Sequence, residues 1–368
     1  MPDATKIKKK YDVVIVGSGP AGAAAGKALA GSGLNVVMLE KRKVPRYKCC
    51  AGVLGGETQA LVKEYFGSLP PDEVYCTPKV IHADHVYGHD EEEKIFKFLW
   101  EWPKEGKEFT KEYLNLWRDK FDYWLAKESG CEIIDQCAFQ GCSPGDDGVT
   151  ITASFQQKEI RLKTRYLIGA DGGISRVRDS LDHCFKKTYE TFVAYQRYYQ
   201  LKNIDLPRDH WHIFRNPTFS AAIAEGTVKD DMIRISVTAM KNQEPKEFME
   251  KFITFLGKNY GAKFGRLART EGCMATNMFV TGNFNLGKGK VVLVGEAAGF
   301  MSMNGGGIDT ALESGYAAGL SVKEASTNGK KVLDIYNEKT VAMRSHIAEC
   351  VRHIQLLHGE DRSVQTVH

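Results

Sequence analysis

The stretch YDVVIVGSGPAG, residues 11–22, decides the fold that the sequence predicts. Its apolar run is typical of a buried strand, and the glycine pattern behind it is typical of a tight turn that opens a helix. Gly17 would make the turn, Gly19 would let backbone amides approach a pyrophosphate, and Gly22 would let the helix pack closely on the strand. The helix N-terminus favours the negative charge of phosphates. The stretch therefore predicts a dinucleotide site, with a plain glycine-rich turn as the alternative.

The residues after this turn complete a strand–helix–strand unit. Residues 21–33 (AGAAAGKALAGSG) are mostly small and end at glycine, and residues 35–41 (NVVMLEK) have the apolar run of a second strand. Glu40 ends this strand, roughly twenty residues after the glycines. A carboxylate there can accept hydrogen bonds from both ribose hydroxyls of an adenosine. These features favour dinucleotide binding, but they do not choose between NAD and FAD.

The rest of the chain contains segments that mix strand and helix patterns and one long segment of antiparallel strand patterns. Residues 111–130 have apolar positions at helical spacing, and the segments from there to residue 171 read as strands. Residues from about 190 to 285 read as antiparallel strands, interrupted by one helix over residues 245–261. Residues 291–300 (VVLVGEAAGF) return to the strand-then-turn pattern, and helices are expected after them.

This alternation predicts an α/β protein with a discontinuous Rossmann-like domain, an inserted antiparallel β-sheet substrate domain and C-terminal helices. The predicted nucleotide-binding domain comprises residues 1–75, 108–182 and 286–325. The predicted substrate domain comprises residues 76–107 and 183–285, and the C-terminal helices comprise residues 326–368.

Composition and charge exclude several classes of protein. Hydrophobic residues make up 43% of the chain and charged residues 26%, which is ordinary for a globular protein. The formal net charge of +4 is too small to indicate a nucleic-acid partner. No apolar run approaches the roughly 20 residues that span a bilayer. The lysine-rich residues 6–10 are expected to form a solvated tail, with peripheral contact to an anionic membrane surface as the alternative.

The cysteines are scattered and indicate reduced thiols. No CxxC pair occurs, so neither a zinc site nor a paired redox motif is predicted. We therefore expect a cytoplasmic protein and no metal. The nine positions are Cys49, Cys50, Cys76, Cys131, Cys137, Cys142, Cys184, Cys273 and Cys350.

Two later segments distinguish the cofactor. Residues 166–181 (YLIGADGGISRVRDSL) and residues 291–315 (VVLVGEAAGFMSMNGGGIDTALESG) follow the first glycine motif in a fixed order. With these motifs the sequence resembles flavoproteins of the p-hydroxybenzoate hydroxylase superfamily, and within it the geranylgeranyl reductase family. The resemblance covers about residues 10–55, 110–180 and 290–325, and it implies FAD as the cofactor.

The resemblance also implies roles for individual residues. Glu40 would hold the adenosine ribose, Arg118 would pack along the FAD, and Glu296 would reach a ribityl hydroxyl, where the family has Asp. Asp171 would lie in the loop that supports the pyrophosphate, and the turn from Asn304 to Gly307 would face the flavin. The whole set expected to bind FAD is Gly17, Gly19, Pro20, Ala21, Gly22, Glu40, Lys41, Arg46, Gly52, Arg118, Asp171, Gly295, Glu296, Gly305, Gly306, Gly307 and Ile308.

The loop PRYKCCAGVLGG, residues 45–56, is similar to the family pattern P-R-x-K-x-C-G-G. By this alignment Cys50 is the family's cysteine near the flavin, Ala51 replaces a glycine, and Cys49 is an extra thiol. Cys50 could be a small wall of the site, a proton donor or reactive thiol, or purely structural. Nearby cations lower a thiol pKa, which makes reactivity plausible. We take Cys50 and Lys48 as the candidate catalytic residues.

The resemblance implies reduction of a carbon–carbon double bond by hydride from reduced flavin, in a small isoprenoid or other apolar unsaturated substrate. The family's YxWxFP-like motif corresponds to residues 219–225 (FSAAIAE), which lack its tryptophan and proline. A second GxGxxG motif for NADPH is missing, so NAD(P)H would visit the flavin transiently or a reduced electron-carrier protein would supply electrons. The alternatives are a flavin monooxygenase or halogenase of the same fold, and a non-catalytic flavin-binding or electron-transfer protein.

Overall fold

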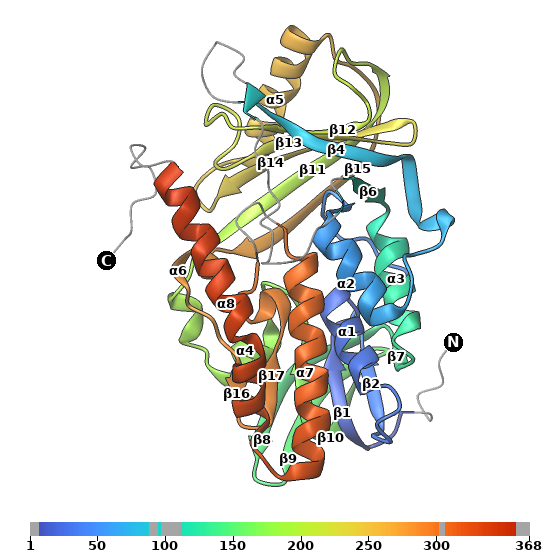
Figure 1. Ribbon diagram of the computed structural model, residues 1–368, viewed down its shortest axis with the longest axis vertical. Coiled ribbons are helices and arrows are strands. Elements are labelled where there is room, and N and C mark those ends of the chain that lie inside the picture. The colour runs from blue at the N-terminus through green and yellow to red at the C-terminus, as the bar shows by residue number, and fades with distance from the viewer. Residues whose placement is uncertain (1–6, 88–94, 97–109, 111, 302–305, 358–368) are drawn as a thin grey trace. The chain divides into compact units, whose positions relative to one another are not determined.

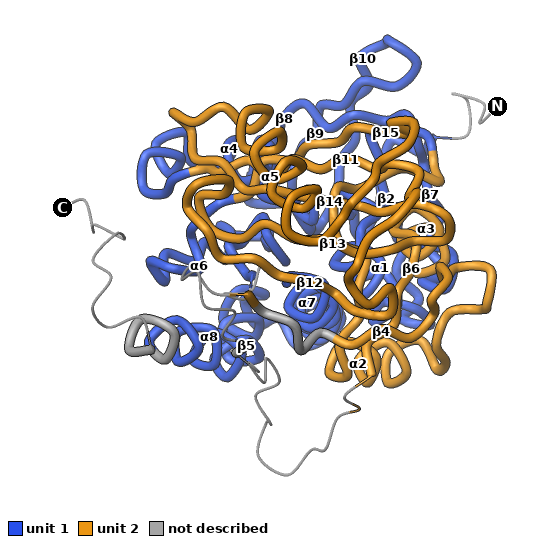
Figure 2. The backbone as a smooth tube through the Cα atoms, turned by 90° about the horizontal axis from the view of Figure 1, so that it is seen from above, with its two compact units in different colours: residues 1–43, 126–190, 276–368 blue, residues 44–125, 191–275 orange. Residues whose placement is uncertain are grey.

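The computed structural model describes residues 7–87, 95–96, 110, 112–301 and 306–357. These residues form two compact units (Figure 2). Unit 1 comprises residues 1–43, 126–190 and 276–368, and unit 2 comprises residues 44–125 and 191–275. Each unit is built around its own sheet.

Unit 1 is built on a mixed sheet with a parallel centre (Figure 1). Its central strands pair in parallel, and the paired residues, such as Val14, Leu167 and Val292, are fully buried. Burial on both faces explains why these strands are continuous apolar runs. The strands, in sheet order and then off the main path, are β16 (Gly287–Lys288), β17 (Val291–Leu293), β10 (Lys158–Gly169), β1 (Lys10–Val16), β2 (Val36–Leu39), β7 (Glu132–Ile134), β9 (Gly148–Phe155) and β8 (Cys137–Gly145).

Two small-residue helices bring the ends of unit 1 together. Helix α1 (Pro20–Leu29) lies on β1, β2 and β10 and packs along α7 (Ile308–Asn328). The approach is close because a Cβ on Gly315 would overlap the carbonyl of Ala21, and a Cβ on Gly319 would meet the carbonyl of Ala25 at 2.5 Å. Helix α8 (Val332–Leu357) packs on α7. The shorter helices of the unit are α4 (Arg176–Leu181), η3 (Phe185–Lys187), α6 (Met278–Thr281) and η4 (Gly295–Ala297).

Unit 2 is a largely antiparallel sheet with one helix-covered face. Helix α5 (Pro245–Tyr260) packs on β14 and β11, and its Phe252 is stacked 5.0 Å from Phe219. The strands, in sheet order with β5 on β4, are β15 (Lys263–Thr276), β11 (Thr191–Asn203), β14 (Met232–Met240), β13 (Ala224–Lys229), β12 (His210–Phe214), β4 (Tyr75–Tyr87), β6 (Tyr113–Leu116), β3 (Val53–Leu54) and β5 (Ile95–Phe96).

The two faces of this sheet differ in chemistry. On β14, Ile233, Ile235 and Val237 belong to the core that α5 covers, whereas the alternate residues Arg234 and Ser236 point to the other face. Both faces are buried at these positions. The remaining helices of the unit are α2 (Gly56–Phe66), η2 (Asp72–Val74) and the start of α3 (Arg118–Glu128).

The fold class and the discontinuous nucleotide-binding sheet are confirmed. One element was wrong: the helix expected over residues 111–130 begins only at Arg118, because residues 113–116 form β6 between β4 and β3. The inserted sheet is also not wholly antiparallel, since β12 pairs with β4 in parallel.

The compact units divide the chain differently from the predicted domains. Residues 44–75 and 108–125, predicted with the nucleotide-binding domain, are grouped in unit 2, and α8 is grouped in unit 1. The pairing of β3 and β4 with β6 explains the first difference. Within the described residues, no helix is both long and apolar enough to cross a membrane.

Candidate functional site

The predicted cofactor residues of unit 1 lie at the carboxyl ends of four neighbouring strands. Val16 pairs with Leu39 on one side and with Gly169 on the other, and Gly169 pairs with Leu293. The loops that follow these four residues therefore begin at one edge of the sheet. This edge is where open parallel sheets bind their ligands.

The first of these loops is the glycine turn. Gly17 has φ +107°, which disfavours any side chain, and a Cβ there would overlap the carbonyl of Ala170. A Cβ on Gly22 would overlap the carbonyl of Gly17. Pro20 is the first residue of α1, and no side chain caps this helix. The amides of its first turn are thus left for a ligand, as phosphate binding requires.

Glu40 lies directly beyond β2 and is 3% exposed. Its Oε2 accepts hydrogen bonds from the Ser18 hydroxyl at 2.8 Å and the Ser18 amide at 3.3 Å. Its Oε1 accepts from the Arg42 amide at 2.9 Å. The carboxylate is therefore fixed against the glycine turn, whereas its neighbour Lys41 is exposed.

Asp171 organises its own loop. Its Oδ1 accepts from the Ser175 hydroxyl at 2.6 Å, and its Oδ2 accepts from the amides of Arg176 at 2.7 Å and Val177 at 3.2 Å. These bonds hold the start of α4. Burial raises the pKa of Asp171, although the hydrogen bonds oppose this. The predicted support of the pyrophosphate would thus act through the loop, and it stays a prediction.

Arg178 was missed by the sequence reasoning, although it lies in the same motif. It is completely buried, and its guanidinium donates to the carbonyls of Gly173 at 2.6 Å and Ala297 at 2.9 Å and to the Tyr189 hydroxyl at 2.6 Å. These contacts tie the loop after β10 to the turn after β17. No local pattern marks this arginine as buried, because α4 (RVRDSL) is mostly polar.

The turn after β17 carries Gly295 and Glu296. The Gly295 amide donates to the Ser314 hydroxyl at 2.9 Å, which joins the turn to α7. In the part of the chain that the structure describes, Glu296 Oε1 is buried and lacks a hydrogen-bond partner. Ile308 begins α7 without a side-chain cap, directly after Gly306 and Gly307. Gly305 and Asn304 lie outside the described residues.

These observations fit FAD as the ligand of unit 1. The amides at the start of α1 suit a pyrophosphate, and the Glu40 carboxylate suits a ribose. Glu296 Oε1, which lacks a partner among the described residues, can accept a hydrogen bond from a hydroxyl group. An acceptor that is buried without a partner costs free energy, which a bound hydroxyl group would recover.

The other predicted residues lie in unit 2, where Asp122 joins two arginines. Arg46 Nη1 is 2.9 Å from Asp122 Oδ2, and Arg118 Nε is 3.0 Å from Asp122 Oδ1. Burial would lower the pKa of Arg118, but the charge of Asp122 reverses this and raises it. Asp122 thus fixes the loop before Cys50 to the first turn of α3.

The loop that carries Lys48 and Cys50 is held by close backbone contacts. The Gly52 amide donates to Cys50 Sγ at 3.4 Å, and the Gly52 carbonyl accepts from the Leu116 amide at 2.8 Å. Gly52 has φ +67°, and a Cβ there would overlap the carbonyl of Leu116. The half-buried Cys50 is therefore presented by a turn that requires glycine.

The extra thiol, Cys49, points to the sheet. Its Sγ is 3.5 Å from the Ala194 carbonyl, and Cys273 Sγ is 3.8 Å from the Cys49 carbonyl. The hydrogen bond with the Cys273 thiol and burial raise the pKa of Cys49. Cys49 therefore keeps its proton.

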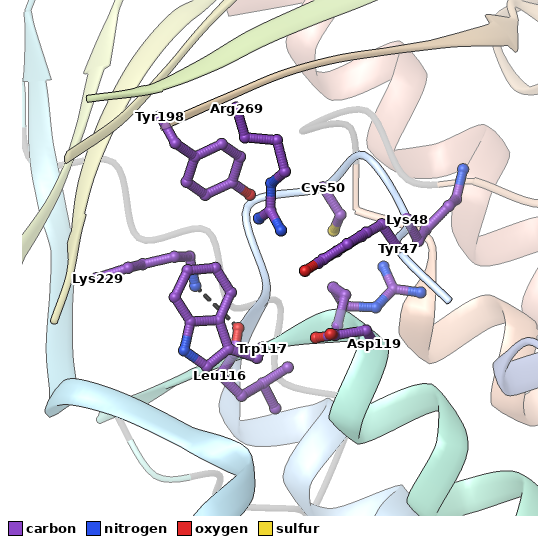
Figure 3. A pocket seen from close by; sticks show the side chains of 10 residues that line it. Tyr47, Lys48, Cys50, Leu116, Trp117, Asp119, Tyr198, Lys229 and Arg269 are labelled. Carbon is purple, nitrogen blue, oxygen red and sulfur yellow. Dashed lines mark hydrogen bonds between the residues drawn. The ribbon is translucent and has the colours of Figure 1, made fainter. Parts of the chain in front are cut away.

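A pocket opens beside Cys50 (Figure 3). Aromatic and basic side chains dominate its lining. The Arg269 guanidinium lies 4.1 Å from the ring centroids of both Tyr47 and Tyr198. The lining residues are Tyr47, Lys48, Cys50, Leu116, Trp117, Arg118, Asp119, Tyr198, Lys229 and Arg269.

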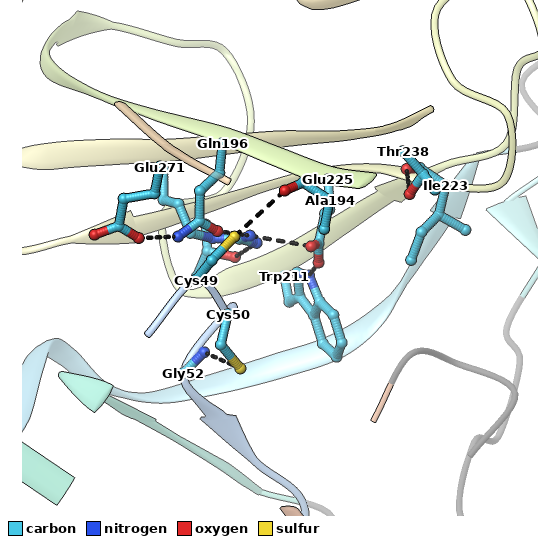
Figure 4. Close-up of polar contacts among 12 residues, drawn as sticks. Cys49, Cys50, Gly52, Ala194, Gln196, Trp211, Ile223, Glu225, Thr238 and Glu271 are labelled. Atoms are coloured by element: carbon cyan, nitrogen blue, oxygen red, sulfur yellow. Dashed lines mark hydrogen bonds and ion pairs between the residues drawn. The ribbon is translucent and has the colours of Figure 1, made fainter. Parts of the chain in front are cut away.

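Beyond this pocket, the polar face of the sheet forms a buried network (Figure 4). Arg234 is completely buried and donates to Glu225 at 3.0 Å and to Gln196 at 3.3 Å. Trp211 Nε1 donates to Glu225 at 2.6 Å. Gln196 also donates to Tyr198 at 3.2 Å, so the network reaches a pocket residue.

Lys229 is one of the pocket residues that sequence reasoning missed. It ends β13, is 1% exposed, and donates to Asn115 Oδ1 at 2.6 Å and to the Leu116 carbonyl at 2.9 Å. Burial lowers its pKa to about 8. No local pattern marks a lysine at a strand end as buried. Among the described side chains, no cluster could hold a metal.

The sheet edge of unit 1 defines the class as a dinucleotide-binding protein. The chain belongs to the family described as an FAD binding domain, whose model matches residues 10–350. FAD is therefore its cofactor, and the chain is a flavoprotein of the FAD-dependent oxidoreductases.

Individual known proteins are more distant. Protein CbrA of Escherichia coli O139:H28 is 27% identical over 323 residues, covering 83% of this chain and 82% of CbrA. A geranylgeranyl bacteriochlorophyll reductase-like protein from Thermoplasma acidophilum superposes with a TM-score of 0.73 at 19% identity, covering 95% of this chain and 87% of that one. The myxobacterial chondrochloren halogenase CndH gives a TM-score of 0.70 at 14% identity, with 95% and 82% covered. These two likenesses show the fold.

Proposed function

We propose that this flavoprotein reduces carbon–carbon double bonds of an isoprenoid or another apolar unsaturated compound. The observation that carries the proposal is the pocket of unit 2, which places proton-bearing groups beside three aromatic rings, those of Tyr47, Trp117 and Tyr198. The likeness to a reductase-like protein supports it at the level of the fold.

Reduction of an alkene adds a hydride to one carbon and a proton to the other. Reduced FAD, when bound, supplies the hydride. The chain's own residues must bind the alkene, exclude water and hold the proton. The rings of Tyr47, Trp117 and Tyr198 offer apolar surface for the alkene. Asp122, by pairing with Arg46 and Arg118, keeps the Cys50 loop in place.

NAD(P)H or a reduced electron-carrier protein is proposed as the electron donor. A monooxygenase or halogenase of the same fold is the competing assignment, and the likeness to CndH supports it at the level of the fold. The two assignments differ in what oxidises the reduced cofactor. In the reductase the organic substrate oxidises the cofactor, and in the monooxygenase or halogenase oxygen does.

The test is anaerobic reduction of the purified holoprotein, followed by addition of a geranylgeranyl lipid. We expect the flavin absorbance to return without oxygen and the lipid to gain two hydrogens per double bond, detected by mass spectrometry. The fully saturated lipid is the matched control and should leave the flavin reduced. A flavin that stays reduced until air enters would contradict the proposal and favour the monooxygenase assignment.

A further inference from the structure

We propose that Lys229 is the acid–base group of the unit 2 pocket, and that it gives the alkene the proton that completes its reduction. This inference rests on the proposed function and names the proton donor within it. The candidates from sequence were Cys50 and Lys48. Lys229 differs from them because its surroundings suit both of its protonation states.

Among the described residues, the hydrogen-bond partners of the Lys229 ammonium group include no carboxylate. Nζ donates to Asn115 Oδ1 at 2.6 Å and to the Leu116 carbonyl at 2.9 Å, and Cys76 Sγ lies 3.7 Å away. Figure 3 shows Lys229 reaching the Leu116 carbonyl beside the Trp117 ring. A buried lysine that served only as a structural cation would be expected to pair with an acid.

The neutral amine is equally well accommodated. An NH2 group has two N–H donors, and Asn115 and Leu116 provide two strong acceptors. Burial raises the pKa of Cys76 to about 11, so this thiol keeps its proton and can donate to the amine lone pair. When Lys229 is protonated, the same sulfur accepts instead. Loss of a proton therefore leaves no partner unsatisfied.

The groups around Lys229 favour a proton transfer near neutral pH. Burial is the largest effect and lowers its pKa to about 8, Cys76 and Cys50 raise it, and Arg234 on β14 lowers it. The carboxylate of Asp230 is occupied by the Thr77 amide at 2.8 Å and by Trp117 Nε1 at 3.0 Å. The charged groups on the other walls are Lys48, Arg118, Asp119 and Arg269. An acid is most effective when its pKa lies near the working pH.

Lys229 also has access to the pocket. Nζ is 5.5 Å from the Trp117 ring centroid. A Cβ added to Gly52 would lie only 3.1 Å from Nζ. The loop that presents Cys50 thus places no side chain of its Gly52 between the backbone and the ammonium group. A ligand that lies on Trp117 would therefore come within reach of Nζ.

Proton transfer from Lys229 completes the reduction of the alkene. Hydride addition to one alkene carbon leaves the second carbon needing a proton. The N–H bond of Lys229 breaks, a C–H bond forms at that carbon, and the lysine is left as a neutral amine. Solvent then returns the proton to Nζ. The two electrons come from the reduced cofactor, so no further oxidant or reductant is needed.

The first test measures Lys229 directly and needs no substrate. The FAD-loaded protein is labelled with trace acetic anhydride across pH 6 to 11, and peptides are quantified by mass spectrometry with exposed Lys79 as the internal reference. We expect Lys229 acetylation to rise with a midpoint near pH 8. A midpoint above pH 10, or no labelling at any pH, would overturn the inference.

The second test follows anaerobic flavin reoxidation by the lipid against pH. We expect the wild-type rate to fall above about pH 8, and Lys229→Met and Lys229→Gln to lose about 100-fold in rate together with that fall. Lys79→Met is the matched control and should keep the wild-type profile. FAD content and the melting temperature establish that each variant folds, and glutamine keeps a donor for the Asn115 and Leu116 acceptors.

Lys229 variants that keep the wild-type rate and pH profile would refute the catalytic role. If the wild-type protein fails to oxidise its flavin with the lipid, the proposed function fails, and with it the role of Lys229 in alkene reduction. The labelling midpoint then decides separately whether Lys229 is an acid–base group at all. The two failures are thus distinguishable.

Discussion

The two sheets bury their strands in opposite ways. In unit 1 the central strands are buried as continuous apolar runs, and the groups that fit FAD are the uncapped start of α1 and the carboxylates of Glu40 and Glu296. In unit 2 the sheet buries an apolar face under α5 and a second face that carries Arg234 and Lys229. The first sheet offers a ligand the loops at its edge, whereas the second offers side chains of the sheet itself. The stability of unit 1 should therefore depend on the close packing of its elements, and the stability of unit 2 on the pairing of its buried charges.

Removal of the shared carboxylate in unit 2 should have the largest effect. Asp122→Asn leaves the buried Arg118 and the partly buried Arg46 without their common acid, and we expect a loss of about 3 kcal/mol in the free energy of unfolding. Thermal unfolding measures it. Asp72→Asn removes an exposed ion pair with Lys79 and is the control, with an expected change below about 0.5 kcal/mol. Equal losses in the two variants would show that buried charge pairing does not govern the stability of unit 2.

A single methyl group should damage unit 1 by shape alone. Gly315→Ala places its Cβ on the Ala21 carbonyl, and we expect a loss of about 3 kcal/mol and of bound FAD. Gly257→Ala in α5 is the same change in a helix, but its Cβ has ordinary contact at 3.7 Å. We expect that variant to gain up to about 1 kcal/mol from helix propensity. The melting temperature measures the stability of each variant, and flavin absorbance measures its bound FAD.

The buried lysine should make unit 2 sensitive to pH. The pKa of Lys229 is about 8 in the folded protein and 10.5 in the ordinary lysine, so the unfolded chain binds more protons between these values. Stability of the wild type relative to Lys229→Met should therefore rise by about 2 kcal/mol from pH 8 to 9.5. Melting temperatures of both proteins across this range measure it. A constant difference would show that Lys229 does not titrate there.

The smallest expected effect concerns Glu40, a charged group at the cofactor edge of unit 1. Glu40→Gln keeps the size of the side chain but loses the charge that strengthens hydrogen bonds to ribose hydroxyls. We expect FAD to bind about tenfold more weakly, and the FAD-free protein to lose about 1 kcal/mol because an amide donor replaces one of the two acceptors that Ser18 and Arg42 use. Glu132→Gln, at an exposed position of β7, is the control. Fluorescence titration with FAD measures the affinity.

The same contrast explains how much could be predicted from sequence. The glycine turn, Glu40 and the small-residue helix α1 follow from local patterns, because a parallel strand and its turn are specified by adjacent residues. Unit 2 depends on pairings between distant segments. Residues 113–116 look helical in isolation, but they become β6 because β3 and β4 flank them. Tertiary contact overrides local pattern there.

The candidate site divides in the same way. The resemblance placed Arg46, Cys50, Gly52 and Arg118 in one group, and the structure brings them together in unit 2. The resemblance gave no indication of Lys229, whose burial results from strands far apart in the chain. Residues 219–225 show the converse. They were aligned with a family substrate motif, but Phe219 packs under α5 in the core.

The contact between α1 and α7 has a consequence for biosynthesis. The face of α1 that carries Ala21 and Ala25 is covered by Gly315 and Gly319, nearly three hundred residues later in the chain. Until residues 308–328 have left the ribosome, α1 has no helix to pack on. Unit 2, whose last residue is 275, is by then complete. The inserted unit is thus synthesised in full before the unit that encloses it, and the nucleotide-binding fold is among the last parts of this protein to form.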